Sequence, residues 1–181
     1  MQRLATETCI VSLAYLSAFF ATFEILMPLQ NLFFAKSAHS ASLLFLPHGV
    51  RVLTAWLLGW RAPLVLLPGV SFVFFYVAGW GALTPSRLAA IAIAVCIPTL
   101  CFQLLRLLGH DLRPAPGKPP CWPCIMAVGL MIAIATSLLT NYAFGSPPMD
   151  YAAYLIGDIG GLFFLMLILM LIFRRLRSYG L

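Results

Sequence analysis

Six long hydrophobic runs, separated by short polar or Pro/Gly-rich breaks, follow one another along the chain. A helix needs about 20 residues to cross the hydrocarbon core of a bilayer, and each run is close to that length. The runs do not alternate apolar and polar residues as the strands of a membrane barrel do. The pattern therefore predicts an all-α integral membrane protein, a compact bundle of six transmembrane helices. The predicted spans are residues 8–29, 42–60, 62–80, 86–107, 123–143 and 151–173.

The composition agrees with this pattern and leaves no room for a soluble domain. Of the 181 residues, 62% are hydrophobic and 9% are charged, whereas soluble proteins have about half and about a quarter. Six spans use roughly 120 residues, so the remainder is enough only for loops and two tails. A fused kinase, cyclase or nucleotide-binding module is excluded, and we expect one transmembrane domain over residues 1–181.

The second hydrophobic run contains a sequence that favours a helix break. Pro47 cannot continue a helix from the residues before it but suits the first turn of a new one. We expect a short, broken helix that starts at Pro47 inside the membrane and ends near Trp60. Its free amide groups and its dipole would then attract anions. The alternative is an ordinary span that is kinked at Pro47, with Arg51 paired to Asp158.

The positive charges predict the orientation of the bundle. With six spans, eight arginines and lysines lie on the side of the two termini, and only Lys36 and Arg87 lie on the opposite side. The positive-inside rule therefore places both termini in the cytoplasm of a multi-pass protein of the bacterial inner membrane. The net charge of +6 follows from this topology. Because the basic residues lie in short loops and form no soluble basic face, nucleic-acid binding is not expected.

A Pro-rich loop, residues 109–122, joins the fourth and fifth predicted spans on the cytoplasmic side. Cys121 and Cys124 at its end have the spacing of a redox or metal pair. Structural disulfides are rare in the cytoplasm, and no second cysteine pair or nearby histidine completes a zinc site. No catalytic set of serine, histidine and aspartate, no phosphate loop and no zinc-binding helix motif occurs, so we expect no enzyme. The sequence names no cofactor and no metal site.

Three ionisable residues at membrane depth are the first candidates for function, because charged groups inside a bilayer are costly. Glu24, Arg51 and Asp158 all fall in the outer half of the membrane when the spans are laid out at 1.5 Å per residue. They either brace the helices as a structural ion pair or enclose a small polar or anionic ligand from the periplasmic side. We predict that Arg51 and Asp158 meet, directly or through one bound polar group, with Glu24 as a second acid.

Other residues near these charges complete the candidate site. His48 is the only histidine predicted at membrane depth, so a structural or hydrogen-bonding role is favoured over haem or metal ligation. Tyr154 lies one helical turn before Asp158 and is placed to orient its carboxylate. Gly157 and Gly161 lie four residues apart on one face, which favours close helix packing, within the chain rather than in a dimer. The candidate ligand-binding residues are Pro47, His48, Gly49, Arg51, Asp158, Glu24 and Tyr154.

Two segments of the chain resemble the membrane-associated sensor domain (MASE type) at the amino-terminal end of many bacterial histidine kinases and cyclic-di-nucleotide enzymes. Residues 46–51 (Leu-Pro-His-Gly-Val-Arg), 57–61 (Leu-Leu-Gly-Trp-Arg) and 67–69 (Leu-Pro-Gly) are similar to its Trp-Pro-x-x-Gly pattern, its Gly-x-Arg turn and its next Pro-Gly. Residues 157–161 (Gly-Asp-Ile-Gly-Gly) are similar to its Gly-Asp-x-x-Gly. The chain departs from the family at Leu46, where the family has Trp, and in its six predicted spans instead of about eight. We also expect no cytoplasmic output domain after the last span.

The resemblance implies a signal-receiving pocket that includes Pro47, Gly49, Arg51, Gly157 and Asp158. A sensor without its own output domain acts through a partner, here another membrane protein, because a signal must bias a second state elsewhere. Two other classes remain open. One is the substrate-binding S-component of an energy-coupling-factor transporter, with the alanine-rich residues 89–94 as a docking patch. The other is a structural accessory subunit of a larger membrane complex.

Overall fold

The computed structural model describes residues 2–33, 42–114, 120–145 and 148–178, and these residues form helices, turns and loops without a β-strand. A π-helical segment, Ala21–Leu26, connects the first two helices, and two 3-10 turns lie at Gly59–Arg61 and Gly79–Leu83. The helices are α1 (Gln2–Phe20), α2 (Met27–Phe33), α3 (Leu46–Leu58), α4 (Ala62–Ala78), α5 (Pro85–Leu107), α6 (Trp122–Phe144) and α7 (Pro148–Ser178).

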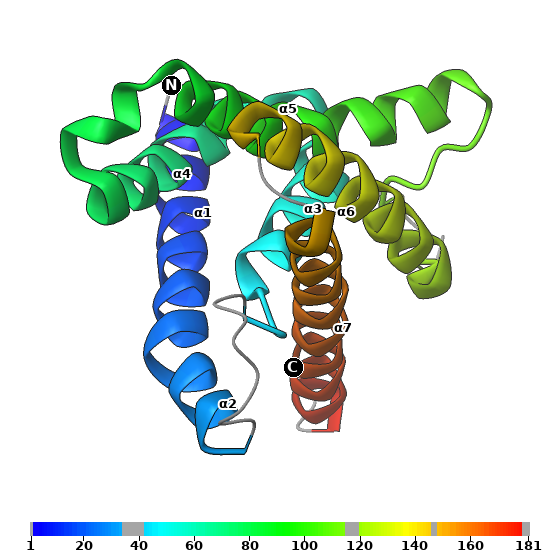
Figure 1. The fold of residues 1–181 in the computed structure, drawn as a ribbon. Helices are drawn as coiled ribbons and strands as arrows, with labels where there is room; N and C mark the ends of the chain where they lie inside the picture. Colours follow the sequence, from blue (N-terminus) through cyan, green and yellow to red (C-terminus); the bar gives the residue numbers. More distant parts are fainter. Residues whose placement is uncertain (1, 34–41, 115–119, 146–147, 179–181) are drawn as a thin grey trace.

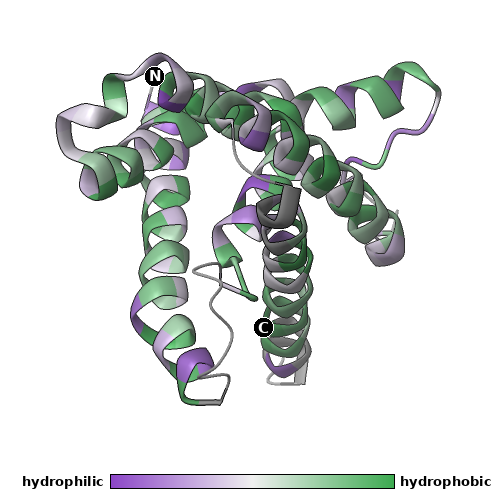
Figure 2. Ribbon diagram, in the orientation of Figure 1, coloured by the Kyte–Doolittle hydropathy of each residue, from purple (hydrophilic) through white to green (hydrophobic). Residues whose placement is uncertain are grey.

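Five helical stretches of the described residues are long and apolar enough to cross a membrane. Hydrophobic residues cover most of their length (Figure 2). The all-α prediction is therefore confirmed, and the apolar helices agree with a multi-pass membrane protein. Length and composition do not confirm the predicted count of six, because the second and third predicted spans fall within one stretch. The stretches are Gln2–Leu32, Leu46–Leu83, Pro85–Leu107, Trp122–Phe144 and Tyr154–Ile172.

Contacts with the first helix show that α3 and α4 run in opposite directions. The start of α3 lies beside the end of α1, whereas the turn after α3 lies beside the start of α1, and the end of α4 returns to the end of α1. The pairs are Leu46 with Thr22, Arg61 with Glu7, and Tyr76 with Phe20. The chain reverses at Gly59, whose φ of 57° lies in the region that favours glycine.

Helix α3 is the central element of the bundle. It lies between α1 on one side and α6 and α7 on the other (Figure 1), and it also packs against α4 and α5. Ten of its 13 residues are buried, so its polar residues face protein. The hydrophilic stretch in α3 that Figure 2 shows is therefore an interior feature of the bundle.

Small residues let α7 pack directly against the chain in front of α3. Gly157 lies against the carbonyl of Ser42, and Gly161 lies against the backbone of Phe45. A Cβ atom at Gly161 would come within 2.7 Å of the Leu46 nitrogen. The Phe45 N–H also donates to the Gly157 carbonyl at 2.8 Å. The glycine face that the sequence assigns to helix packing therefore packs within the chain.

Candidate functional site

A cavity of about 300 Å³ lies among α1, α3, α4, α5, α6 and α7. At one end it is lined by the polar side chains of Arg51, Thr136, Ser137 and Asp158, and its other walls are mostly hydrophobic. An apolar cavity with a few convergent polar groups is the usual form of a small-molecule site, and such sites start at roughly 300 Å³. The aromatic rings in its walls belong to Tyr15, Phe19, Phe23, Phe45, Phe74, Phe144 and Tyr154.

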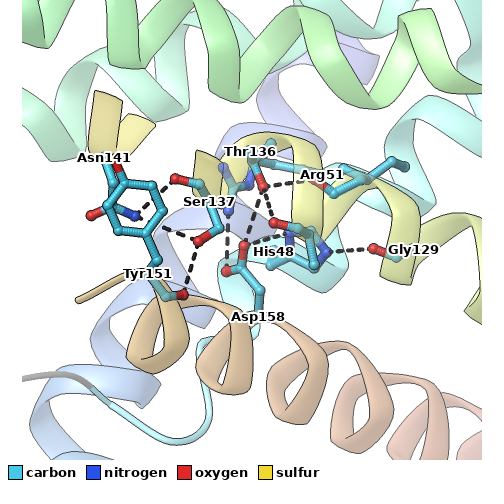
Figure 3. A network of polar contacts seen from close by, with 10 residues as sticks. His48, Arg51, Gly129, Thr136, Ser137, Asn141, Tyr151 and Asp158 are labelled. Carbon is cyan, nitrogen blue, oxygen red and sulfur yellow. Dashed lines mark hydrogen bonds and ion pairs between the residues drawn. The ribbon is translucent and has the colours of Figure 1, made fainter. Parts of the chain in front are cut away.

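Arg51 and Asp158, which the sequence analysis expects to meet, lie together at the polar end of this cavity (Figure 3). Nη2 of Arg51 is 3.7 Å from Oδ1 of Asp158, which suits an ion pair but is too long for a hydrogen bond. Their side chains are 8% and 7% exposed. Helix α3 carries the arginine and α7 the aspartate, and the close approach at Gly157 and Gly161 brings the two helices into reach.

His48 connects this ion pair to α6. Its Nδ1 lies 3.2 Å from Oδ2 of Asp158, and its Nε2 lies 3.3 Å from the carbonyl oxygen of Gly129. Both ring nitrogens thus face oxygen atoms, whereas a neutral imidazole carries an N–H donor on only one of its two nitrogens. The Nδ1 contact is not aligned as a hydrogen bond, so it is a close approach of the ring to the carboxylate. His48 is not among the residues that line the cavity, but it contacts Asp158, which is.

Helix α6 supplies polar groups that the sequence analysis did not name. The Thr136 hydroxyl lies 3.3 Å from Oδ2 of Asp158, and the Ser137 hydroxyl donates to the carbonyl of Tyr151 at 2.9 Å. Nδ2 of Asn141 donates to the carbonyl of Ser137 at 2.8 Å. The available signal was the group of polar residues at positions 136, 137, 140 and 141 in an otherwise apolar span, because such groups are costly in a bilayer.

The guanidinium group of Arg51 keeps hydrogen-bonding capacity that the described residues do not use. Its Nε makes no hydrogen bond to any of them, and its ion pair is too long for one. Its central carbon lies 5.6 Å from the centre of the Phe45 ring, a cation–π distance. A buried donor without an acceptor costs free energy, so the described residues leave this guanidinium incompletely paired.

The other predicted site residues are distributed unevenly around the cavity. Tyr154 lines it and is 48% exposed. Pro47 and Gly49 are buried in the first turn of α3 and do not line the cavity, and Gly49 packs against Leu162 and Leu165 instead. Glu24 is exposed in the π-helical segment and does not line the cavity, so the structure does not bring it to Arg51.

The start of α3 does not offer the anion site that the sequence analysis expects there. The Leu46 N–H donates to the hydroxyl of Thr22 at 3.2 Å, and the His48 N–H donates to the carbonyl of Phe45 at 3.2 Å. Pro47 has no N–H to offer. Thr22, which is fully buried, therefore caps this helix, and the charge that can meet an anion is the Arg51 side chain one turn later.

Cys121 and Cys124 form a disulfide at the start of α6. The sequence analysis did not expect a structural disulfide at this predicted cytoplasmic position. The bridge closes a loop of one helical turn and lies 12 residues, about 18 Å along α6, from Thr136. Among the residues that the structure describes, no group of three or more histidines, cysteines, aspartates or glutamates could hold a metal ion.

Comparisons with protein-family models, with curated proteins and with solved structures give no match to this chain. The resemblance to membrane-associated sensor domains therefore stays a prediction from the sequence. The structure locates the residues that carry it. Arg51 and Asp158 line one cavity, and Gly157 and Gly161 hold α7 against the chain in front of α3.

Proposed function

We propose that the protein is a membrane-embedded sensory or ligand-binding module of the MASE type, without chemistry of its own, that acts through a partner membrane protein. The observation that supports this most is the cavity beside the buried pair of Arg51 and Asp158. An ion pair that only braces helices requires no cavity. It is also normally completed by hydrogen bonds, whereas this pair is 3.7 Å apart and leaves Nε of Arg51 unused.

The proposal includes six membrane spans, of which the second is broken. Helix α3 has 13 residues, about 20 Å, and is too short to cross a bilayer alone. The chain reverses after it, which supports counting α3 and α4 as two separate spans. Residues 42–45 in front of α3 are not helical. Non-helical backbone is tolerated at membrane depth where protein buries it, and the bond from Phe45 to Gly157 supplies such a contact.

The proposed orientation has the end of α3, near Leu58, in the cytoplasm. Arg61 pairs there with Glu7 near the amino terminus, and Trp56 donates to the carbonyl of Leu112 in the loop that carries Arg113. In Figure 1 the N mark lies at the top and the end of α7 at the bottom, so the picture gives no support for placing both termini on one side. The cytoplasmic location predicted for the carboxyl terminus therefore rests on the charge distribution alone.

Of the two other classes, the transporter subunit gains no support from the alanine-rich residues 89–94. Ala90 and Ala94 are buried and line the cavity, and Ala92 is the exposed alanine of the patch. A docking surface needs its small residues on the outside. A structural accessory subunit would not need the cavity. The experiment below tests both of these classes.

The experiment extracts the protein with its surrounding membrane into polymer nanodiscs and measures bound molecules and copurifying proteins by native mass spectrometry. A specific adduct is expected in the unmodified protein and in Ala92→Trp, whose side chain faces outward. It is expected to be lost in Ala94→Trp, which fills the cavity. A copurifying kinase or cyclase supports signalling; an ATPase or a large stoichiometric complex supports the other classes. An adduct that Ala94→Trp retains contradicts the proposed site.

A further inference from the structure

The cavity also indicates the chemistry of its occupant, an inference that rests on the binding function proposed above. We propose that it takes an apolar monocarboxylate of the fatty-acid class. The carboxylate binds the guanidinium of Arg51, and the apolar body lies along the aromatic walls toward the mouth of the cavity.

The charges that line the cavity favour an anion. Among the described residues that line it, the charged side chains are the two arginines Arg51 and Arg87 and one acid, Asp158. Arg87 is partly buried, and its Nη1 donates to the carbonyl of Gly81 at 2.9 Å. With two guanidinium groups and one carboxylate, the described part of the lining carries one excess positive charge. A ligand with one negative charge restores the balance, whereas a cation would add to the excess.

The hydrogen-bonding groups at the polar end favour an acceptor in the ligand. The Thr136 and Ser137 hydroxyls already donate within the protein, to the carbonyls of Ile132 at 2.8 Å and Tyr151 at 2.9 Å. The guanidinium of Arg51 lines the cavity in a side chain that is 8% exposed, and its nearest charged partner, Asp158, lies at 3.7 Å, which is too long for a hydrogen bond. A guanidinium edge matches the two oxygens of a carboxylate. Since Asp158 already balances part of the charge, a monoanion fits better than a phosphate dianion.

The remaining walls favour an apolar body. Phe19, Phe45 and Phe74 face the cavity, and Ala90 and Ala94 leave space between them. The most exposed lining residues are apolar or aromatic side chains of α1–α2, α4, α6 and α7, so a molecule from the bilayer meets apolar surface at the mouth. They are Val77 at 67%, Tyr154 at 48%, Phe144 at 39% and Phe23 at 36% exposure.

The test uses the full chain in lipid nanodiscs and a pair of photoreactive probes, a diazirine fatty acid and the diazirine fatty alcohol of the same length. Labelled peptides are mapped by mass spectrometry. The acid is expected to label residues of the cavity walls, with competition by dodecanoate and not by dodecanol. Arg51→Gln is expected to reduce this labelling at least tenfold. Arg106→Gln, at an exposed arginine outside the cavity, is the matched control and is expected to leave it unchanged.

The double variant Arg51→Gln/Asp158→Asn, which removes both charges of the Arg51–Asp158 pair, separates a loss of labelling caused by misfolding from a loss caused by the missing guanidinium. If this folded variant labels as strongly as the unmodified protein, the proposal is overturned. Equal labelling of the cavity by the alcohol also overturns it but leaves the binding function standing. Labelling confined to residues outside the cavity overturns the fatty-acid ligand, while the native adduct measured above decides separately whether the cavity binds any molecule.

Discussion

Asp158 is the residue on which the polar cluster depends. Arg51, His48 and Thr136 all reach its carboxylate, from two other helices. The sequence predicts the pairing of Arg51 with Asp158, because two opposite charges at the same depth in an apolar bundle need each other. It does not predict the position of Thr136 or Glu24. The positions of these two residues depend on which face of each helix turns inward. Packing decides this, and the hydrophobic pattern does not show it, because these spans are apolar on all faces.

Asp158→Asn is expected to destabilise the protein by about 3–5 kcal/mol, because it leaves the buried guanidinium of Arg51 without a counter-charge. The double variant Arg51→Gln/Asp158→Asn is expected to recover much of this loss. Unfolding in mixed detergent micelles, followed by circular dichroism, measures both. Glu7→Gln is the control, since it removes a less buried acid that pairs with Arg61 and Arg3, and it is expected to cost less than Asp158→Asn. Equal losses in Asp158→Asn and Glu7→Gln would show that the buried pair has no special weight.

Helix α7 reaches the site because its glycines replace side chains at the contact with residues 42–46. The Gly157–Gly161 spacing made this face predictable. The start of α3 at Leu46 follows from the chemistry of Pro47, but its cap does not. Thr22 is 24 residues away, and nothing local in the sequence shows that a π-helical segment presents its hydroxyl there.

Gly161→Ala is expected to destabilise the protein by about 1–3 kcal/mol, because the new Cβ overlaps the backbone of Phe45 and Leu46, which cannot rotate away. Ala152→Val on the exposed face of the same helix is the control and is expected to change little. Thermal unfolding in detergent measures the difference. A Gly161→Ala protein as stable as the control would mean that α7 does not approach the chain this closely.

The disulfide at the start of α6 is expected to contribute little to the fold. It joins residues only three apart, and in the chain-entropy account so short a loop yields about 2 kcal/mol at most. Cys121→Ser/Cys124→Ser is therefore expected to fold, and to keep the native adduct, since Thr136 lies far along α6. Stability with and without reductant, compared in the unmodified and double-serine proteins, measures this contribution. Loss of the adduct on reduction would instead connect the disulfide to the site.

At the scale of the whole molecule, hydropathy predicts the class of fold and the approximate spans. It does not predict how the second and third spans share the stretch Leu46–Leu83. Whether this stretch forms one long helix or two antiparallel ones depends on Gly59 and on contacts with α1. These contacts join residues that lie far apart in the sequence. The positive-inside rule predicts which end of the bundle lies in the cytoplasm, and this rule reflects membrane insertion rather than packing.

This rule leads to a test of the topology. Single cysteines are introduced at positions 87 and 113 of a variant without the five native cysteines, and cells with a permeabilised outer membrane are treated with a membrane-impermeant maleimide. Position 87 is expected to react from outside, and position 113 only after the inner membrane is opened. Position 36, which lies outside the described residues, is expected to behave as position 87, and position 177 as position 113. Reaction of 36 or 87 from the cytoplasmic side would invert the bundle. The ends of α4 and α5 that line the cavity at Val77 and Arg87 would then lie on the cytoplasmic side of the membrane.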